Sequence, residues 1–135
     1  MNTAYRVWDG EQMHYWDDEG LSLEIKMDEW ILWREEGRGC RVSIAESGDE
    51  ESVLMWHIGL LDKNNKAIYQ NDFFEFANGI KGIVAWIEKE AMFNVPNYYD
   101  SYSDCPTLAF SEHAHCLGEV KGNIYENPQL LEGVK

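Results

Sequence analysis

The sequence predicts a mainly β fold, with residues 1–135 forming a single domain that has a barrel-like sheet core and a short C-terminal helix. Three observations support this prediction. Apolar and polar residues alternate with a period of two in several short segments, and amphipathic helical patterns are almost absent. Turn-forming residues recur at intervals of about eight to twelve residues. Short strands at this spacing are typical of a closed or nearly closed sheet.

The first half of the chain is predicted to contain a hairpin followed by three strands. Residues 4–16 hold two β-favouring segments around Asp9-Gly10, a pair that suits tight hairpin turns. Strict alternation then assigns the core face of the next strand to Leu21, Leu23, Ile25 and Met27. A helical turn is possible over residues 28–35, but the β-branched and aromatic side chains of residues 30–33 favour a strand. A further strand is expected over 41–45, before an acidic loop over 46–51.

The second half is predicted to consist of strands over 53–61, 67–69, 73–76, 83–87 and 91–95. Between the first two, Asn64-Asn65 can supply two left-handed residues, because Asn tolerates positive φ better than other non-glycine residues. We expect residues 96–107 to form a long surface loop. Residues 108–110 and 116–120 are expected to pair as strands. The short helix should begin after Asn127, with Pro128 in its first turn and Gly133 at its end.

Composition excludes several classes of protein. Apolar residues make up 44% and aromatic residues 13%, so the chain is not a disordered one. No segment has the ~20 uncharged apolar residues that a membrane span needs. Eleven Lys and Arg against 25 Asp and Glu give a net charge of −14, which disfavours direct binding to DNA or RNA. The absence of a secretory signal and the odd number of cysteines predict a cytoplasmic protein with free thiols.

Three ordered motifs occur at the start, in the middle and near the end. They are residues 5–9, Y-R-V-W-D, with M-H-Y-W at 13–16; residues 59–72, G-L-L-D-K-N-N-K-A-I-Y-Q-N-D; and residues 118–128, G-E-V-K-G-N-I-Y-E-N-P. Together they resemble the YopX-like family of bacteriophage and prophage proteins. The resemblance covers the chain except for 17–52 and 96–115. Asn65 and Asn71 replace usual glycines and should keep a positive φ, and Lys121 replaces an apolar residue, so it should not lie deep in the core.

The resemblance implies a mainly β, barrel-containing fold, a phage origin, the cytoplasm of a bacterial host and a homo-oligomer. It implies no catalytic residue. The residues themselves also give little sign of catalysis, because no nucleophile elbow, P-loop or dinucleotide-binding fingerprint is present. Paired carboxylates such as Glu35-Glu36 occur in any acidic protein. We therefore expect a protein that is not an enzyme and that uses no cofactor.

Metal binding is also not expected from the sequence. Cys105, His113, His115 and Cys116 are the one cluster of residues typical of zinc ligands. On a strand, the two alternating histidines point to one face and Cys116 to the other, which offers two ligands where zinc needs four. The acidic runs at 17–19 and 46–51 lack the alternating oxygen ligands of a calcium loop.

The leading functional hypothesis is a self-associating protein that acts by binding to a host protein or a small ligand. Trp30 and Trp33 flank a charged run and are weak candidates for a partner surface. Arg34, Arg38 and Arg41 are weak candidates for a pocket that holds the phosphate of a nucleotide. One alternative is an acidic mimic of nucleic acid that inhibits a host enzyme. A second alternative is a metal-dependent hydrolase.

Overall fold

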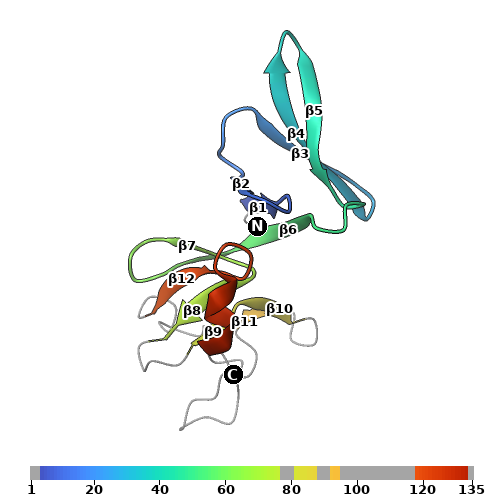
Figure 1. Ribbon diagram of the computed structural model, residues 1–135. Helices are drawn as coiled ribbons and strands as arrows, with labels where there is room; N and C mark the ends of the chain where they lie inside the picture. Colours follow the sequence, from blue (N-terminus) through green and yellow to red (C-terminus); the bar gives the residue numbers. More distant parts are fainter. Residues whose placement is uncertain (1–3, 77–80, 88–91, 95–117, 134–135) are drawn as a thin grey trace. The chain divides into compact units, whose positions relative to one another are not determined.

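The computed structural model describes residues 4–76, 81–87, 92–94 and 118–133. Strands account for 60% of these residues, and the one helical element among them is a short 3-10 helix (Figure 1). The fold is mainly β with a curled half-barrel sheet, which confirms the predicted fold class. The predicted loop over 96–107 and the predicted strand over 108–110 lie outside the described residues.

Residue contacts divide the described chain into two compact units. The N-terminal unit covers residues 4–56, and the C-terminal unit covers the described residues from 57 onward. The boundary falls inside strand β6 (Val53–Leu61). Residues 53–56 of this strand pair with β1 (Tyr5–Trp8), whereas His57 and Leu61 pair with β7 (Ala67–Tyr69). Whether the chain behaves as one domain stays a prediction.

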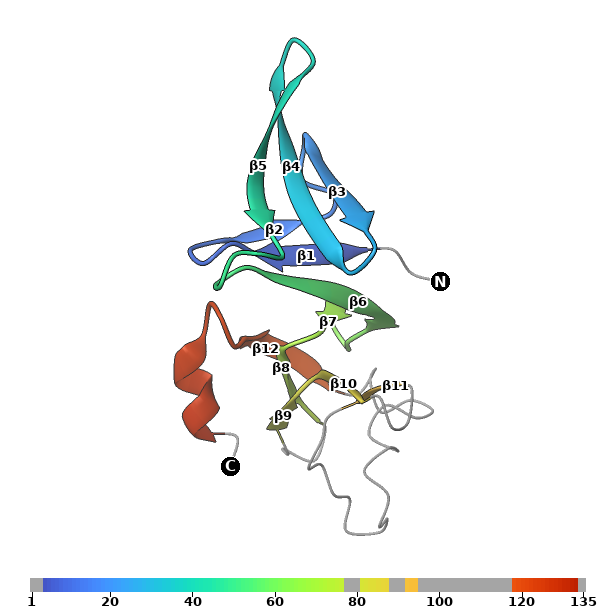
Figure 2. The ribbon, with the colours of Figure 1, turned by 90° about the vertical axis from the view of Figure 1, so that its right-hand side faces the viewer.

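The N-terminal unit contains a hairpin and a three-stranded antiparallel sheet, both visible in Figure 2. In the hairpin, β1 pairs with β2 (Met13–Tyr15) around the predicted Asp9-Gly10 turn, where Gly10 has a φ of 105°. The sheet has the strand order β3-β4-β5. Its strands are β3 (Leu21–Lys26), β4 (Glu29–Gly37) and β5 (Cys40–Glu46). The strand at 30–33 is therefore confirmed and extended.

The core of the N-terminal unit lies between the hairpin and the sheet. Its buried members are Tyr5, Val7, Leu32 and Ala45, and Leu21 and Leu23 pack against them. The prediction that Ile25 and Met27 share this core face is wrong, since their side chains are 55% and 92% exposed. The reason is local: β3 ends at Lys26, and Met27 stands in the following turn with a φ of 59°. Alternation assigns a face to a residue but does not show where the covering layer ends.

The C-terminal unit is built from short antiparallel strands. A three-stranded sheet has the order β12-β8-β9, formed by β12 (Glu119–Asn123), β8 (Asp72–Glu75) and β9 (Lys81–Ile83). β10 (Ala85–Ile87) pairs with β11 (Met92–Asn94). The 3-10 helix η3 (Pro128–Gly133) follows β12 and matches the predicted C-terminal helix. The buried core consists of Ile68, Phe74, Phe76 and Val84.

The turns of this unit test the predicted backbone conformations. Asn65 and Asn71 have φ values of 63° and 68°, which confirms that each takes the conformation expected of a glycine. Asn64 does not have a positive φ, so the turn uses one left-handed residue where two were possible. The predicted strand over 83–87 is interrupted at Val84, whose N–H donates to the carbonyl of Asp72 at 2.9 Å. A single apolar run thus forms two strands.

Candidate functional site

The aromatic and basic residues predicted for binding lie in the β3-β4-β5 sheet but do not converge. Trp30 packs against the buried core of the N-terminal unit. Trp33 has the opposite parity along β4 and lies on the other face of the sheet. There the guanidinium carbon of Arg41 stands 4.0 Å from its ring centroid, and its indole N–H donates to Glu24 at 3.1 Å. The structure therefore brings Trp33 and Arg41 together, in a cation–π contact within one sheet.

The other two arginines are placed elsewhere. Arg38 lies at the exposed β4–β5 turn with a φ of 56°. Arg34 approaches the buried His14, with 3.5 Å between its terminal nitrogen and Nδ1. On the far side of that ring, Nε2 lies 2.8 Å from a carboxylate oxygen of Asp9. Burial raises the pKa of Asp9, but hydrogen bonds from Gln12 N–H, His14 and Glu11 N–H outweigh it and hold the pKa below its ordinary value.

A shallow hollow of about 290 Å³ lies beside Arg41. Its lining residues are Gly20, Leu21, Ser22, Glu35, Gly39, Cys40 and Arg41. Glu35 stands directly opposite Arg41 across the β4–β5 pair, so the single cation of this hollow faces a carboxylate. Arg34 and Arg38 do not line it. Of the three predicted arginines, this hollow therefore contains one, and it is paired across the strands with a carboxylate.

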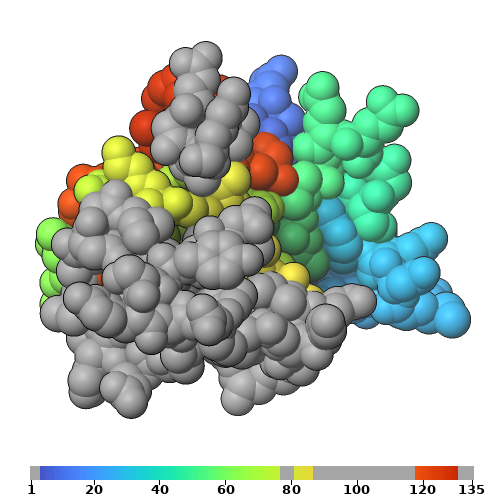
Figure 3. Space-filling view, turned by 90° about the horizontal axis from the view of Figure 1, so that it is seen from below, coloured from blue at the N-terminus to red at the C-terminus, as the bar shows by residue number. Residues whose placement is uncertain are grey.

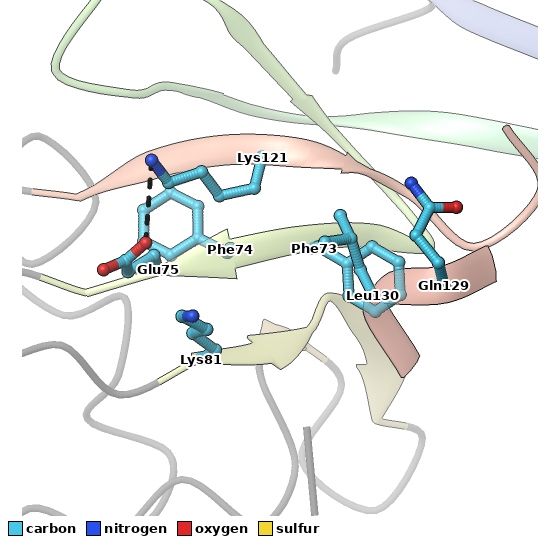
Figure 4. Close-up of a pocket in the computed structure, with 7 residues that line it drawn as sticks. All are labelled: Phe73, Phe74, Glu75, Lys81, Lys121, Gln129 and Leu130. Carbon is cyan, nitrogen blue, oxygen red and sulfur yellow. Dashed lines mark ion pairs between the residues drawn. The ribbon is translucent and has the colours of Figure 1, made fainter. Parts of the chain in front are cut away.

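A larger pocket of about 400 Å³ lies in the C-terminal unit, between the β12-β8-β9 sheet and η3 (Figure 4). It is lined by Phe73, Phe74, Glu75, Lys81, Lys121, Gln129 and Leu130. The two phenylalanines are almost fully buried, whereas the charged side chains lie at the surface. The pocket thus combines an apolar base with charged groups at its rim.

The charged residues of the pocket form a row across three strands. Glu75 on β8 stands directly opposite Lys81 on β9, and its carboxylate lies 3.6 Å from Nζ of Lys121 on β12. Lys121 also pairs with Glu119, and these partners raise the pKa of its ammonium group above the ordinary value. In the part of the chain that the structure describes, no carboxylate forms an ion pair with Lys81.

Asp62 holds β12, and with it Lys121, in place beside β8. The residue is 3% exposed, and its carboxylate accepts N–H groups from Asn64, Lys66 and Val120 at 2.8–2.9 Å. Burial raises the pKa of Asp62, but these three bonds and the charge of Lys66 lower it below its ordinary value. Hydrogen bonds to the buried carboxylate of Asp62 therefore connect β12, which forms one wall of the pocket, to the β6–β7 turn.

Sequence reasoning did not find this pocket, because its residues on β8 and β9 lie far along the chain from those on β12 and η3 and meet them only through the strand order. The one available signal was Lys121, a charge where the resembling motif has an apolar residue. Within the described ranges, no three His, Cys, Asp or Glu side chains are grouped to hold a metal ion. Cys105, His113, His115 and Cys116 lie outside those ranges. Among the described residues there is also no helix long and apolar enough to span a membrane.

Comparisons with known proteins agree with the predicted resemblance. A family model described as YopX protein matches residues 4–132. The SPbeta prophage-derived uncharacterized protein YopX of Bacillus subtilis (strain 168) is 39% identical over 140 residues, and the match covers 100% of both chains. The crystal structure of protein yopX from Bacillus subtilis has a TM-score of 0.71 and 37% identity, with full coverage of both chains.

A second crystal structure, of protein EF1440 from Enterococcus faecalis, has a TM-score of 0.57. It is 20% identical, and the match covers 95% of this chain and 96% of that one. At this level of identity the likeness concerns the fold alone.

Proposed function

The chain belongs to the YopX family, and from this premise we propose that it is a phage or prophage accessory protein that acts by binding. Its partner is a host protein or a small ligand, and it works as a self-associated oligomer in the cytoplasm of the bacterial host. It needs no catalytic residue for this role. The relative from Bacillus subtilis, with its prophage origin, supports the accessory role.

The observation that carries the self-association is the exposed apolar surface at the β3–β4 turn. Met27 is 92% exposed and Ile25 is 55% exposed. In Figure 3, light-blue atoms from this region of the N-terminal unit are visible at its surface. A methionine at positive φ is unfavourable locally, since Asn or Gly fits such a turn better. Burial of these side chains against a second copy would remove about 25 cal/mol of unfavourable hydration per Å².

Light scattering at several protein concentrations tests the self-association. We expect the wild-type chain to have the mass of an oligomer, and Ile25→Thr combined with Met27→Asn to shift the mass towards the monomer. Asn suits the positive φ at position 27, so the variant should unfold at a temperature no lower than that of the wild-type chain in its monomeric form. Leu61→Thr is the matched control, because Leu61 is 45% exposed but belongs to the C-terminal unit. A wild-type chain that stays a monomer at every concentration would refute this part of the proposal.

A second candidate function is mimicry of nucleic acid, and the charge of the N-terminal unit favours it. Residues 4–56 contain 14 Asp and Glu against 5 Lys and Arg, a net charge of −9. The acidic turn between β5 and β6, from Glu46 to Glu51, is exposed throughout. A surface of this kind can occupy the cationic groove of a host enzyme that binds DNA or RNA.

A further inference from the structure

We infer that the pocket between the β12-β8-β9 sheet and η3 binds a small organic anion, with its carboxylate or phosphate at Lys81 and its apolar part against Leu130. The inference rests on the proposed binding role and gives it a ligand class.

The charge balance of the pocket favours an anion. Lys121 already has two carboxylate partners, Glu75 and Glu119. Glu75 is therefore engaged by a cation, and Lys81 supplies the positive charge that the described carboxylates leave uncompensated. Figure 4 shows the ammonium group of Lys81 on the side of Glu75 away from Lys121. In a chain with a net charge of −14, an anion gains little from the protein as a whole, so the local ammonium group has to provide the attraction.

The opposite wall carries the apolar side chain of Leu130, and hydrogen bonds connect it to β12. Leu130 belongs to η3, and its N–H donates to the carbonyl of Asn127 at 3.0 Å. The side chain of Asn127 in turn accepts the N–H of Asn123, the last residue of β12, at 3.2 Å. The helix is thus fixed to the same strand that carries Lys121. Gln129, beside Leu130, adds an amide that can donate and accept hydrogen bonds.

The volume limits the ligand to a small molecule. About 400 Å³ lies in the lower part of the range of small-molecule sites, roughly 300–1,000 Å³. A neutral molecule would leave Lys81 without a counter-charge, and a cation would be repelled by it. A small organic anion with a compact apolar body fits the charge, the apolar wall and the size together.

Isosteric probes of different charge test this inference. Benzoate, benzamide and benzamidine have nearly the same shape but carry negative, neutral and positive charge. Titrated into the ¹⁵N-labelled full chain, benzoate should give saturable shifts of the amide signals of Lys81, Lys121 and Leu130. Benzamide should bind at least about tenfold more weakly, because it lacks the charge-assisted contact with Lys81. Equal responses to all three probes, or no response to benzoate and phenyl phosphate, would overturn the inference.

Two further probes distinguish the source of the charge and the need for an apolar body. Tighter binding of phenyl phosphate than of benzoate would assign the site to phosphates, and the reverse would assign it to carboxylates. Inorganic phosphate should bind more weakly than phenyl phosphate, since it gains nothing from Leu130. If inorganic phosphate binds as well as phenyl phosphate, the apolar wall plays no part and the inference is wrong on that point.

Matched variants locate the site. Lys81→Met should weaken the tighter-binding anion about tenfold or more, and Lys81→Arg should restore most of the affinity. Lys26→Met makes the same change at an exposed lysine of the N-terminal unit, outside the pocket, and should alter the affinity less than about twofold. Unchanged binding by Lys81→Met would overturn the inference. The self-association is measured separately by light scattering, so an oligomer that binds none of the anions would refute the pocket and leave the proposed function standing.

Discussion

Asp62 shows how one side chain organises the C-terminal unit. Both carboxylate oxygens are used: Oδ1 accepts the N–H groups of Asn64 and Lys66, and Oδ2 accepts that of Val120. The first two bonds close the β6–β7 turn, and the third attaches β12, which lies almost sixty residues further along the chain. A buried carboxylate is costly unless it is fully hydrogen-bonded, and here three backbone donors meet that need.

We predict that Asp62→Asn lowers the free energy of unfolding by about 2 kcal/mol at pH 7, because an amide has one acceptor oxygen and no charge. The folded-state pKa of Asp62 is lowered, so its stabilising effect is present above the unfolded value of about 3.9. It is lost as the pH falls through the folded-state pKa. Urea denaturation at several pH values measures this: the advantage of the wild type should shrink below about pH 4.

Glu50→Gln is the control for this experiment, since it removes a carboxylate from an exposed turn. It should change the free energy of unfolding by less than about 0.5 kcal/mol. If the difference in the free energy of unfolding between wild type and Asp62→Asn is the same at pH 7 and at acid pH, the assigned role of the charge is wrong.

The strands of the C-terminal unit approach one another closely where β12 begins. A Cβ atom added at Gly118 would lie 2.5 Å from the carbonyl oxygen of Glu75 and 2.5 Å from the ring of Phe74. Because the first of these is backbone and the second is fully buried, neither can move aside cheaply. The entry into β12 therefore depends on a residue without a side chain.

Gly118→Ala should accordingly reduce the free energy of unfolding by about 3 kcal/mol, the upper range for overpacking a well-filled site. Gly37→Ala is the comparison, because it meets nothing within 4 Å and suffers only from its φ of 91°. Its cost should be about 1–2 kcal/mol, the cost of a left-handed conformation for a residue with a Cβ atom. Thermal and urea denaturation of both variants measure the difference, and equal costs would show that the close approach to β8 is not what matters.

At the scale of strands and turns, sequence patterns predicted where the elements lie but not which distant strands pair with each other. Local signals were sufficient for the first hairpin, for the positive φ of Asn65 and Asn71, and for the 3-10 helix that begins at Pro128. The break at Val84 depends on hydrogen bonds with Asn71 and Asp72, which no local pattern encodes. The pairing of β12 with β8 and the pocket that it creates likewise depend on residues far apart in the sequence.

For the whole molecule, the mimicry hypothesis depends on the uneven distribution of charge and can be tested by varying the salt concentration. If the N-terminal unit occupies a cationic groove, its complexes depend on attraction that salt screens. Host proteins retained on the immobilised chain at about 50 mM NaCl should then be released at about 500 mM NaCl. At the higher salt concentration the Debye length is about threefold shorter, so attraction between the exposed charges is screened. Replacing the exposed Glu46, Glu50 and Glu51 with Gln should weaken retention at low salt. Retention that is insensitive to salt would count against mimicry.

The position of the unit boundary inside β6 has a practical consequence for dissecting the protein. A gene cut between Trp56 and His57 would divide β6, leaving residues 53–56 paired with β1 in one fragment and His57 and Leu61 paired with β7 in the other. Each fragment would then end or begin inside this strand, and the residues at a new chain terminus are poorly ordered unless they are held by further contacts. Separate expression of the two halves should therefore include the entire Val53–Leu61 segment in both pieces.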